Sequence, residues 1–166
     1  MEFTVIQGDI AAQSADTLVN AAGTSLKMGS GIAGALRRGA NGPINEEAVS
    51  KGPVELGGVA VTDACDLNAE YVIHAAAMPH YGDGQATTES IRDATRNTLT
   101  KADELECESL VIPILGTGVA GFNFERGAEL ICEVVADHKP STLTDVRVIG
   151  YSDRQYTSLQ AVAEEI

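Results

Sequence analysis

The stretch ESLVIPILGTGVAGF at residues 108–122 joins an apolar run to a glycine-rich loop. The run Leu110–Ile114 has no polar residue, which is typical of a strand covered on both faces of a sheet. After the loop, apolar residues recur at helical spacing at Ala128, Ile131, Cys132 and Val135. A buried strand, a glycine turn and an amphipathic helix in this order predict one unit of an α/β fold.

The same alternation continues through the chain. Short segments rich in β-forming residues predict further strands at Phe3–Ile6, Thr17–Asn20, Val59–Thr62, Tyr71–Ala75 and Val146–Gly150. Helical spacing predicts helices at Ile32–Ala40, from Ile91 to Leu105 and from Tyr156 to Ile166. We therefore expect an α/β sandwich with a largely parallel central sheet, in which ligands bind outside the carboxyl ends of the strands.

Length and composition indicate a single domain spanning residues 1–166, with 44% hydrophobic residues. No apolar run reaches the roughly 18 residues of a membrane helix, and the N-terminus has no signal-peptide pattern, so we expect a cytoplasmic protein. Three cysteines and three histidines show no metal-ligand spacing, so we expect no metal site and no cofactor.

Acidic residues outnumber basic residues by 24 to 11, which gives a formal net charge of −13. This balance argues against binding to nucleic acid or to an anionic membrane, because both attract Lys and Arg. The acidic, lysine-poor composition resembles that of halophilic proteins from salt-adapted cytoplasms, and a generic acidic surface is the alternative interpretation.

Two stretches, GSGIAG at 29–34 and GTGVAG at 116–121, match the pattern G-x-G-x-x-G. Glycine-rich turns expose backbone N–H groups that can cradle a phosphate, although small residues also serve tight turns. The first loop begins nine positions after Asn20, where a strand is expected to end, and Asp153 lies about 35 residues beyond the start of the second. Both spacings fit a dinucleotide-binding fold poorly, so an NAD(P)-dependent oxidoreductase using the second loop is only the alternative function.

Further motifs surround these loops: QGDI at 7–10, DTLVNAAGTSL at 16–26, GGVAVTDACDLNAEYVIHAA at 57–76 and VRVIGYSDR at 146–154. With these motifs and the two loops, nearly the whole chain resembles the macrodomains, which bind ADP-ribose. The resemblance implies a three-layer α/β/α sandwich with a mixed, largely parallel sheet and one elongated crevice. ADP-ribose, free or as a protein-linked or O-acetyl derivative, is then the expected partner.

The resemblance also implies roles for individual residues. Asp9 would accept a hydrogen bond from the adenine amino group, with the Ile10 backbone alongside, and Tyr151 would lie against the adenine ring. Asn20 would lie near the distal ribose, which Phe122 would cover. The two loops would grip the diphosphate through Gly29, Ser30, Gly31, Ile32, Gly116, Thr117, Gly118, Val119, Ala120 and Gly121.

Each of the side chains outside the loops also has a structural interpretation. Asp9 could cap a helix, and Asn20 could bridge loops through backbone hydrogen bonds. Tyr151 could be a packed aromatic at a strand end, and Phe122 could simply pack against the next helix. These alternatives stay open at the level of sequence.

The histidines give little sign of catalysis. His74 lies in the apolar run YVIHAA and is expected to be a buried structural residue. His80 and Asp83 lie in the loop MPHYGDGQ, where a structural or solvent-facing role is expected. No Ser–His–Asp or Cys–His pairing occurs at a recognisable spacing.

Three positions depart from the usual macrodomain pattern. Gly23 stands where many members have a second Asn, Ala33 where many hydrolytic members have Asp, and Ala120 where a Tyr is frequent. By the resemblance, all three lie at the distal ribose. We therefore expect binding of ADP-ribose. Hydrolysis of ADP-ribosyl esters, assisted by the bound phosphate and by backbone groups, is a further alternative.

Overall fold

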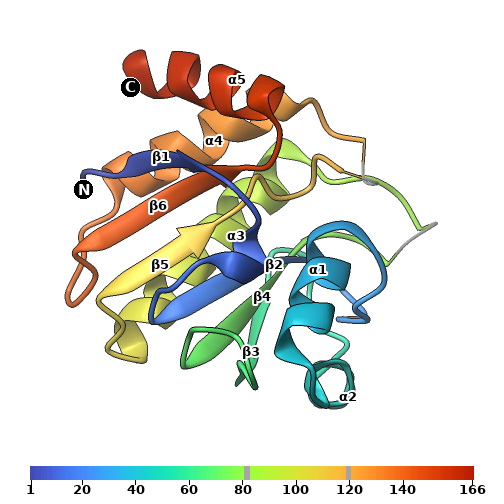
Figure 1. The fold of residues 1–166 in the computed structure, drawn as a ribbon. Coiled ribbons are helices and arrows are strands. Elements are labelled where there is room, and N and C mark those ends of the chain that lie inside the picture. The colour runs from blue at the N-terminus through green and yellow to red at the C-terminus, as the bar shows by residue number, and fades with distance from the viewer. Residues whose placement is uncertain (81–82, 119–120) are drawn as a thin grey trace.

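The computed structural model describes residues 1–80, 83–118 and 121–166. Strands and helices alternate along the chain as the sequence predicts (Figure 1). The short helices η1 and α2 are not indicated by the sequence, because neither is long enough to show a clear helical repeat. In order, the elements are β1 (Thr4–Gln7), the 3-10 helix η1 (Ile10–Ala12), β2 (Thr17–Gly23), α1 (Gly31–Ala40), α2 (Ile44–Ser50), β3 (Val59–Asp63), β4 (Tyr71–Met78), α3 (Thr88–Glu104), β5 (Ser109–Ile112), α4 (Phe124–Asp137), β6 (Asp145–Gly150) and α5 (Asp153–Glu164).

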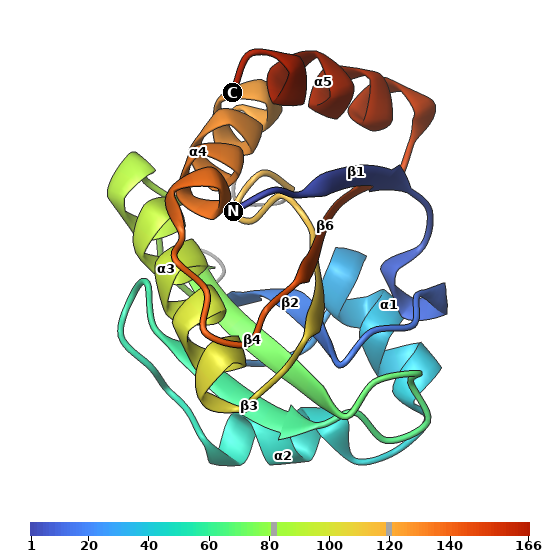
Figure 2. The same cartoon turned by 90° about the vertical axis from the view of Figure 1, so that its left-hand side faces the viewer.

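In the described residues, the strands form one six-stranded sheet in the order β1-β6-β5-β2-β4-β3. All neighbouring strands are parallel except β3, which runs antiparallel to β4 at the edge. Helices α1 and α2 cover one face of the sheet, and α3, α4 and α5 cover the other (Figure 2). This arrangement confirms the three-layer α/β/α sandwich with a mixed, largely parallel sheet.

A hydrophobic core lies on each face of the sheet, and successive side chains of the central strands point alternately into one core and the other. On β5, Leu110 and Ile112 pack in the cluster with α3 and α4, whereas Val111 packs in the cluster with α1. All three are fully buried, and burying one such aliphatic side chain contributes about 1.5–3 kcal/mol. The two cores therefore hold the strand ends in fixed positions below the loops that follow them.

The strand β5 ends two residues before the end expected at Ile114. Pro113 follows the strand directly, and a proline has no N–H with which to continue the hydrogen-bond ladder. The pairing of β5 with β2 covers only two residues of each strand, although β2 continues beside β4 for its full length. The chain after β5 therefore separates from β2 at the carboxyl edge of the sheet.

A buried polar network connects β2, β3 and β4 at His74. Its Nε2 lies 2.9 Å from Oγ1 of Thr62, and its Nδ1 lies 3.0 Å from Nδ2 of Asn20. Because an amide nitrogen only donates, Nδ1 accepts and the Nε2–H donates to Thr62. Burial lowers the pKa of His74 to about 4, and the charge of Lys51 is a smaller cause. His74 is thus a neutral, buried structural residue, as the sequence predicts.

We predict that protonation of His74 destabilises the protein as the pH falls from about 6.5 to about 4. In this range, the unfolded chain binds a proton at His74 that the folded protein does not bind. The free energy of unfolding therefore decreases with falling pH, by up to about 3 kcal/mol at the lower limit. Urea unfolding at a series of pH values measures this slope, and His74→Gln should flatten it. Equal slopes in the two proteins would contradict the assignment.

Candidate functional site

A cleft of about 410 Å³ lies at the carboxyl edge of the parallel strands. Its lining comes from the turn after β1, the ends of β2 and β4, the start of α1, the loop after β5 and the turn after β6. Open α/β sheets bind their ligands at this edge, because the strand-to-helix loops converge there. The cleft is therefore the candidate functional site.

The cleft brings together most of the residues that the sequence singles out. Gly29, Gly121, Asn20 and Phe122 are not part of its lining in the described structure. Val119 and Ala120 lie outside the described residues. The expected residues that do line it are Asp9, Ile10, Ser30, Gly31, Ile32, Gly116, Thr117, Gly118 and Tyr151.

Asp9 lies at one end of the cleft and also caps η1. Its Oδ1 accepts a hydrogen bond of 2.9 Å from the N–H of Ala11, the arrangement of an N-cap. The side chain is exposed, and its second oxygen, Oδ2, makes no hydrogen bond within the described chain. The residue that follows, Ile10, is buried at the same end. The structure therefore confirms the capping role and leaves Oδ2 of Asp9 without a partner in the described chain, beside the cleft that the residue lines.

Tyr151 follows β6 and borders the same end of the cleft. Its side chain is 70% exposed, and its backbone N–H donates to Oε1 of Gln155, which holds the start of α5 against it. The alternative of a packed aromatic is therefore wrong, because the ring lies outside the core. An exposed aromatic face beside a carboxylate acceptor suits a flat base that carries an amino group.

The first glycine loop forms one wall of the cleft through the start of α1. The N-cap Ser30 makes no side-chain cap hydrogen bond, so the first N–H groups of the helix stay free for a ligand. Gly31 has a φ of 62°, and a side chain there would meet no atom within 4 Å. A helix start of this kind attracts anions through its N–H groups and its dipole. Gly29 instead lines a neighbouring groove with Met28 and Arg37.

The second glycine loop forms the opposite wall. Gly116 has a φ of 75°, and an added Cβ would lie 2.6 Å from Cβ of Ala86, so only glycine fits. Thr117 donates to the carbonyl of Ile114, which fixes the start of the turn. At Gly118, an added Cβ would meet no atom within 4 Å, so this backbone faces open space in the cleft. Gly121 closes the loop, because its N–H donates to the carbonyl of Gly118.

Asn20 and Phe122 both make structural contacts within the described chain. Asn20 is 1% exposed, and its Nδ2 is held by His74 rather than directed at a ligand. Phe122 is half-buried and packs against the core near Gly127 of α4, as the alternative interpretation expected. Neither side chain is part of the cleft lining, and Oδ1 of Asn20 is buried without a hydrogen-bond partner in the described chain.

Arg38 also lines the cleft, although it is not among the residues that the sequence predicts there. It lies on α1 one turn after Ala35, which itself lies one turn after Gly31, and all three line the cleft. Its Nη1 lies 3.2 Å from the place that a Cβ on Gly34 would occupy, so the guanidinium points back toward the start of the helix. With Asp9, it supplies the charge in the described cleft lining. The spacing of Gly31, Ala35 and Arg38 on one helix face is the signal that could have found it.

Two of the departures from the family pattern are packing positions here. A side chain at Gly23 would come within 3.0 Å of the carbonyl oxygen of Pro79, so the ends of β2 and β4 are in close contact. Ala33 is 7% exposed and belongs to the core cluster beneath α1. Neither position presents a polar side chain to the cleft.

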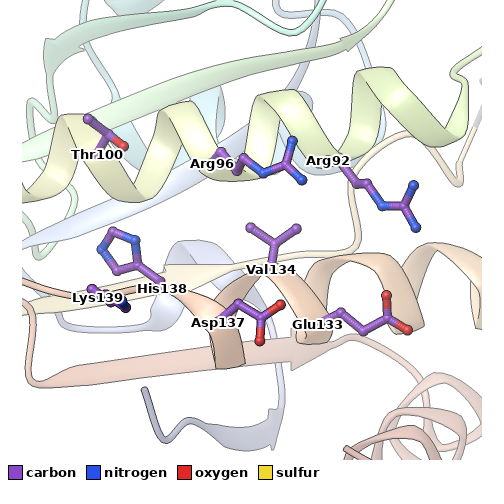
Figure 3. A pocket seen from close by; sticks show the side chains of 8 residues that line it. All are labelled: Arg92, Arg96, Thr100, Glu133, Val134, Asp137, His138 and Lys139. Carbon is purple, nitrogen blue, oxygen red and sulfur yellow. The ribbon is translucent and has the colours of Figure 1, made fainter.

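A second hollow, between α3 and α4, has a different character. Figure 3 shows Arg92 and Arg96 on α3 facing Glu133 and Asp137 on α4, with Val134 between them. Opposite charges on the two helices compensate each other. The hollow is lined by helix side chains rather than by exposed backbone N–H groups, so we do not assign a ligand to it.

The fold and the two glycine walls define an α/β sandwich with a cleft at the strand ends. The model of the Macro domain family matches residues 19–131. An uncharacterized protein from Sulfolobus acidocaldarius is 39% identical over 167 residues, covering 98% of this chain and 90% of that protein. One from Mycobacterium tuberculosis is 37% identical over 164 residues, covering 99% of this chain and 45% of that protein. The chain therefore belongs to the macrodomain family.

Solved structures agree in fold. A mutant macrodomain of Oceanobacillus iheyensis with ADPR has a TM-score of 0.88 at 22% identity, covering 97% of this chain and 91% of that one. The macrodomain of the same organism with ADP has a TM-score of 0.85 at 25% identity, with coverages of 96% and 89%. A Trypanosoma brucei macrodomain in complex with ADP-ribose has a TM-score of 0.83 at 23% identity, with coverages of 95% and 67%.

We predict a large loss of stability for valine at Gly116 and little change for valine at Gly118. Gly116→Val combines a positive φ with a steric overlap and should lower the free energy of unfolding by about 2–5 kcal/mol. Gly118→Val has neither problem and should change it by less than about 1 kcal/mol. Denaturant unfolding of both variants checks this, and a loss of stability in Gly118→Val equal to that in Gly116→Val would contradict the described loop.

Proposed function

We propose that this macrodomain binds ADP-ribose, free or modified at its distal ribose, in the cleft between the two glycine loops. The observation that carries the proposal is the pairing of two open backbone walls, at Gly31 and Gly118, with an acceptor and an exposed aromatic ring at one end. The walls suit a diphosphate, since backbone N–H groups and a helix start bind anions. The macrodomains from Oceanobacillus iheyensis and Trypanosoma brucei with ADPR, ADP or ADP-ribose support the same ligand.

The roles then follow from position. Oδ2 of Asp9 accepts from the adenine amino group, and Tyr151 stacks on the ring. Ser30, Gly31 and Ile32 bind the diphosphate from one side, and Gly116, Thr117 and Gly118 bind it from the other. Arg38 adds charge close to the first wall. Gly29 and Gly121 shape the two loops.

The oxidoreductase alternative has no support. The sheet order β1-β6-β5-β2-β4-β3 differs from the order of the dinucleotide-binding fold, and residues 116–118 of the GTGVAG loop line the cleft of a macrodomain.

The net charge of −13 supports a small ligand held by backbone groups rather than a nucleic-acid partner. It also supports a salt-rich cytoplasm as the working environment. Among the described residues, no helix has the length and apolarity needed to span a membrane.

Calorimetric titration in molar KCl with ADP-ribose, NAD and AMP tests the function. We expect ADP-ribose to bind with a Kd on the order of micromolar, well ahead of AMP, which lacks the diphosphate, and of NAD, whose nicotinamide extends past the distal ribose. Gly118→Val should abolish binding, because its side chain enters the space of the diphosphate while the fold is retained. Absence of both heat and thermal stabilisation with ADP-ribose would contradict the proposal.

We further predict that Asp9→Ala weakens ADP-ribose binding by about 1–3 kcal/mol, because the adenine amino group loses its acceptor. Loss of the η1 cap is a second effect of this change, and inosine diphosphate ribose separates the two. This analogue carries a carbonyl in place of the adenine amino group. The wild type should prefer ADP-ribose over the analogue, and Asp9→Ala should lose the preference. If the preference survives in the variant, Asp9 does not contact the base.

A further inference from the structure

The hollow between α3 and α4 is bordered by two rows of charged side chains, one on each helix. Arg92 and Arg96 lie one turn apart on α3. Glu133 and Asp137 lie one turn apart on α4. Figure 3 shows Arg92 and Glu133 toward one end of the hollow, with Arg96 and Asp137 further along it. A basic row and an acidic row therefore run side by side along a space of about 510 Å³.

The two rows balance in sign but make no direct contact. Within the described chain, the ion pair that involves either row joins Arg96 to Asp93 of its own helix, at 3.4 Å. Exposed pairs within one helix are weak. Arg96, Glu133 and Asp137 are exposed, and Arg92 is half-buried. The charges of both rows are therefore accessible to a partner.

We propose that this hollow is the interface of a symmetric dimer of the chain. Two identical faces that meet are related by a two-fold axis in the plane of the contact. When the axis runs along the hollow, the half turn exchanges the two sides and puts α3 of each copy over α4 of the other. Arg92 then faces Glu133 of the partner subunit, and Arg96 faces Asp137 of the partner subunit.

This orientation is selected by charge. An axis across the hollow would instead place α3 over α3, so that arginine meets arginine and carboxylate meets carboxylate. Like charges in direct opposition cost several kilocalories per mole, which suppresses that arrangement. The two rows are therefore complementary to their own copy in one orientation.

The hollow also has the shape that such a contact needs. Arginine binds a carboxylate through parallel hydrogen bonds from a long side chain, so it can reach into a recess on a partner. The space between the helices leaves room for the arginines of the second copy. Val134 lies between the rows and is buried, which gives the recess an apolar floor (Figure 3).

Salt favours this association in an acidic protein. A net charge of −13 makes two copies repel each other at long range. Molar salt shortens the screening length to about 3 Å and removes most of this repulsion. Ion pairs that become partly buried between the copies are screened much less. We therefore expect the dimer to form in concentrated salt.

Sedimentation equilibrium of the full chain in molar KCl tests the dimer. The wild type should show a monomer–dimer equilibrium with a Kd on the order of 10–100 μM. Arg92→Glu combined with Arg96→Glu should weaken association at least about a hundredfold, because carboxylates then face carboxylates. Glu133→Arg combined with Asp137→Arg should do the same with arginines. An equimolar mixture of the two double variants should restore dimers, since rows of opposite sign face each other again in the mixed pair.

A matched control separates the position of the charges from their total. Lys27→Glu combined with Arg154→Glu changes the net charge by the same amount as the double arginine variant, at exposed residues outside the hollow. It should keep the wild-type equilibrium. Thermal unfolding near the wild-type temperature shows that each variant is folded.

Three results would overturn the proposed dimer. These are a wild type that stays monomeric at every concentration, a mixture of the folded double variants that stays monomeric, and a control that loses association as completely as the double arginine variant. Binding of ADP-ribose is tested separately, because the two rows lie outside the lining of the cleft.

Discussion

The cleft depends on one interruption of backbone hydrogen bonding, at Pro113. The ladder between β5 and β2 ends before this proline, which has no N–H to extend it, and the chain turns away into the second glycine loop. Pro113 and Ile114 then line one side of the opening, and Ala21 and Ala22 of β2 line the other. The small side chains of β2 at this level leave the space unfilled.

Under the proposed function, an acidic protein binds a dianion in this cleft. A net charge of −13 repels phosphate at long range, although salt screens the repulsion over about 10 Å or less. At short range, the field is set by the uncapped start of α1, equivalent to roughly half a positive charge, and by the opposing loop at Gly118. The N–H groups need no basic side chain to act. Arg38 adds one positive charge to the lining of the same cleft.

The sequence predicted the strands, the layers and most of the cleft, because these follow from local patterns. Each apolar run and each glycine loop is contained in a stretch of about fifteen residues or fewer. The order of the motifs along the chain indicated the family. The error at β5 came from reading an apolar run as a strand through Pro113. The sequence pattern alone could not show that Asp9 both caps η1 and lines the cleft.

What the sequence could not give was pairing between distant segments. Asn20 was expected near the ligand, but strand register places it opposite His74, 54 residues later, and both side chains are buried there. Ser25 and His80 are brought together by the same register, 55 residues apart.

The ends of β2 and β4 show how one missing side chain can change the packing beside a cleft. A side chain at position 23 would lie 3.0 Å from the carbonyl oxygen of Pro79, so a larger residue there requires the ends of β2 and β4 to shift apart by a few tenths of an ångström. Ala33 is buried in the core cluster beneath α1 and presents no side chain to the cleft. The polar side chains gathered here by the ends of β2 and β4 are therefore those of the two following turns. Because the turn after β2 is anchored by the fully buried Leu26, whose N–H donates to the carbonyl of Gly23, its geometry is set without a ligand.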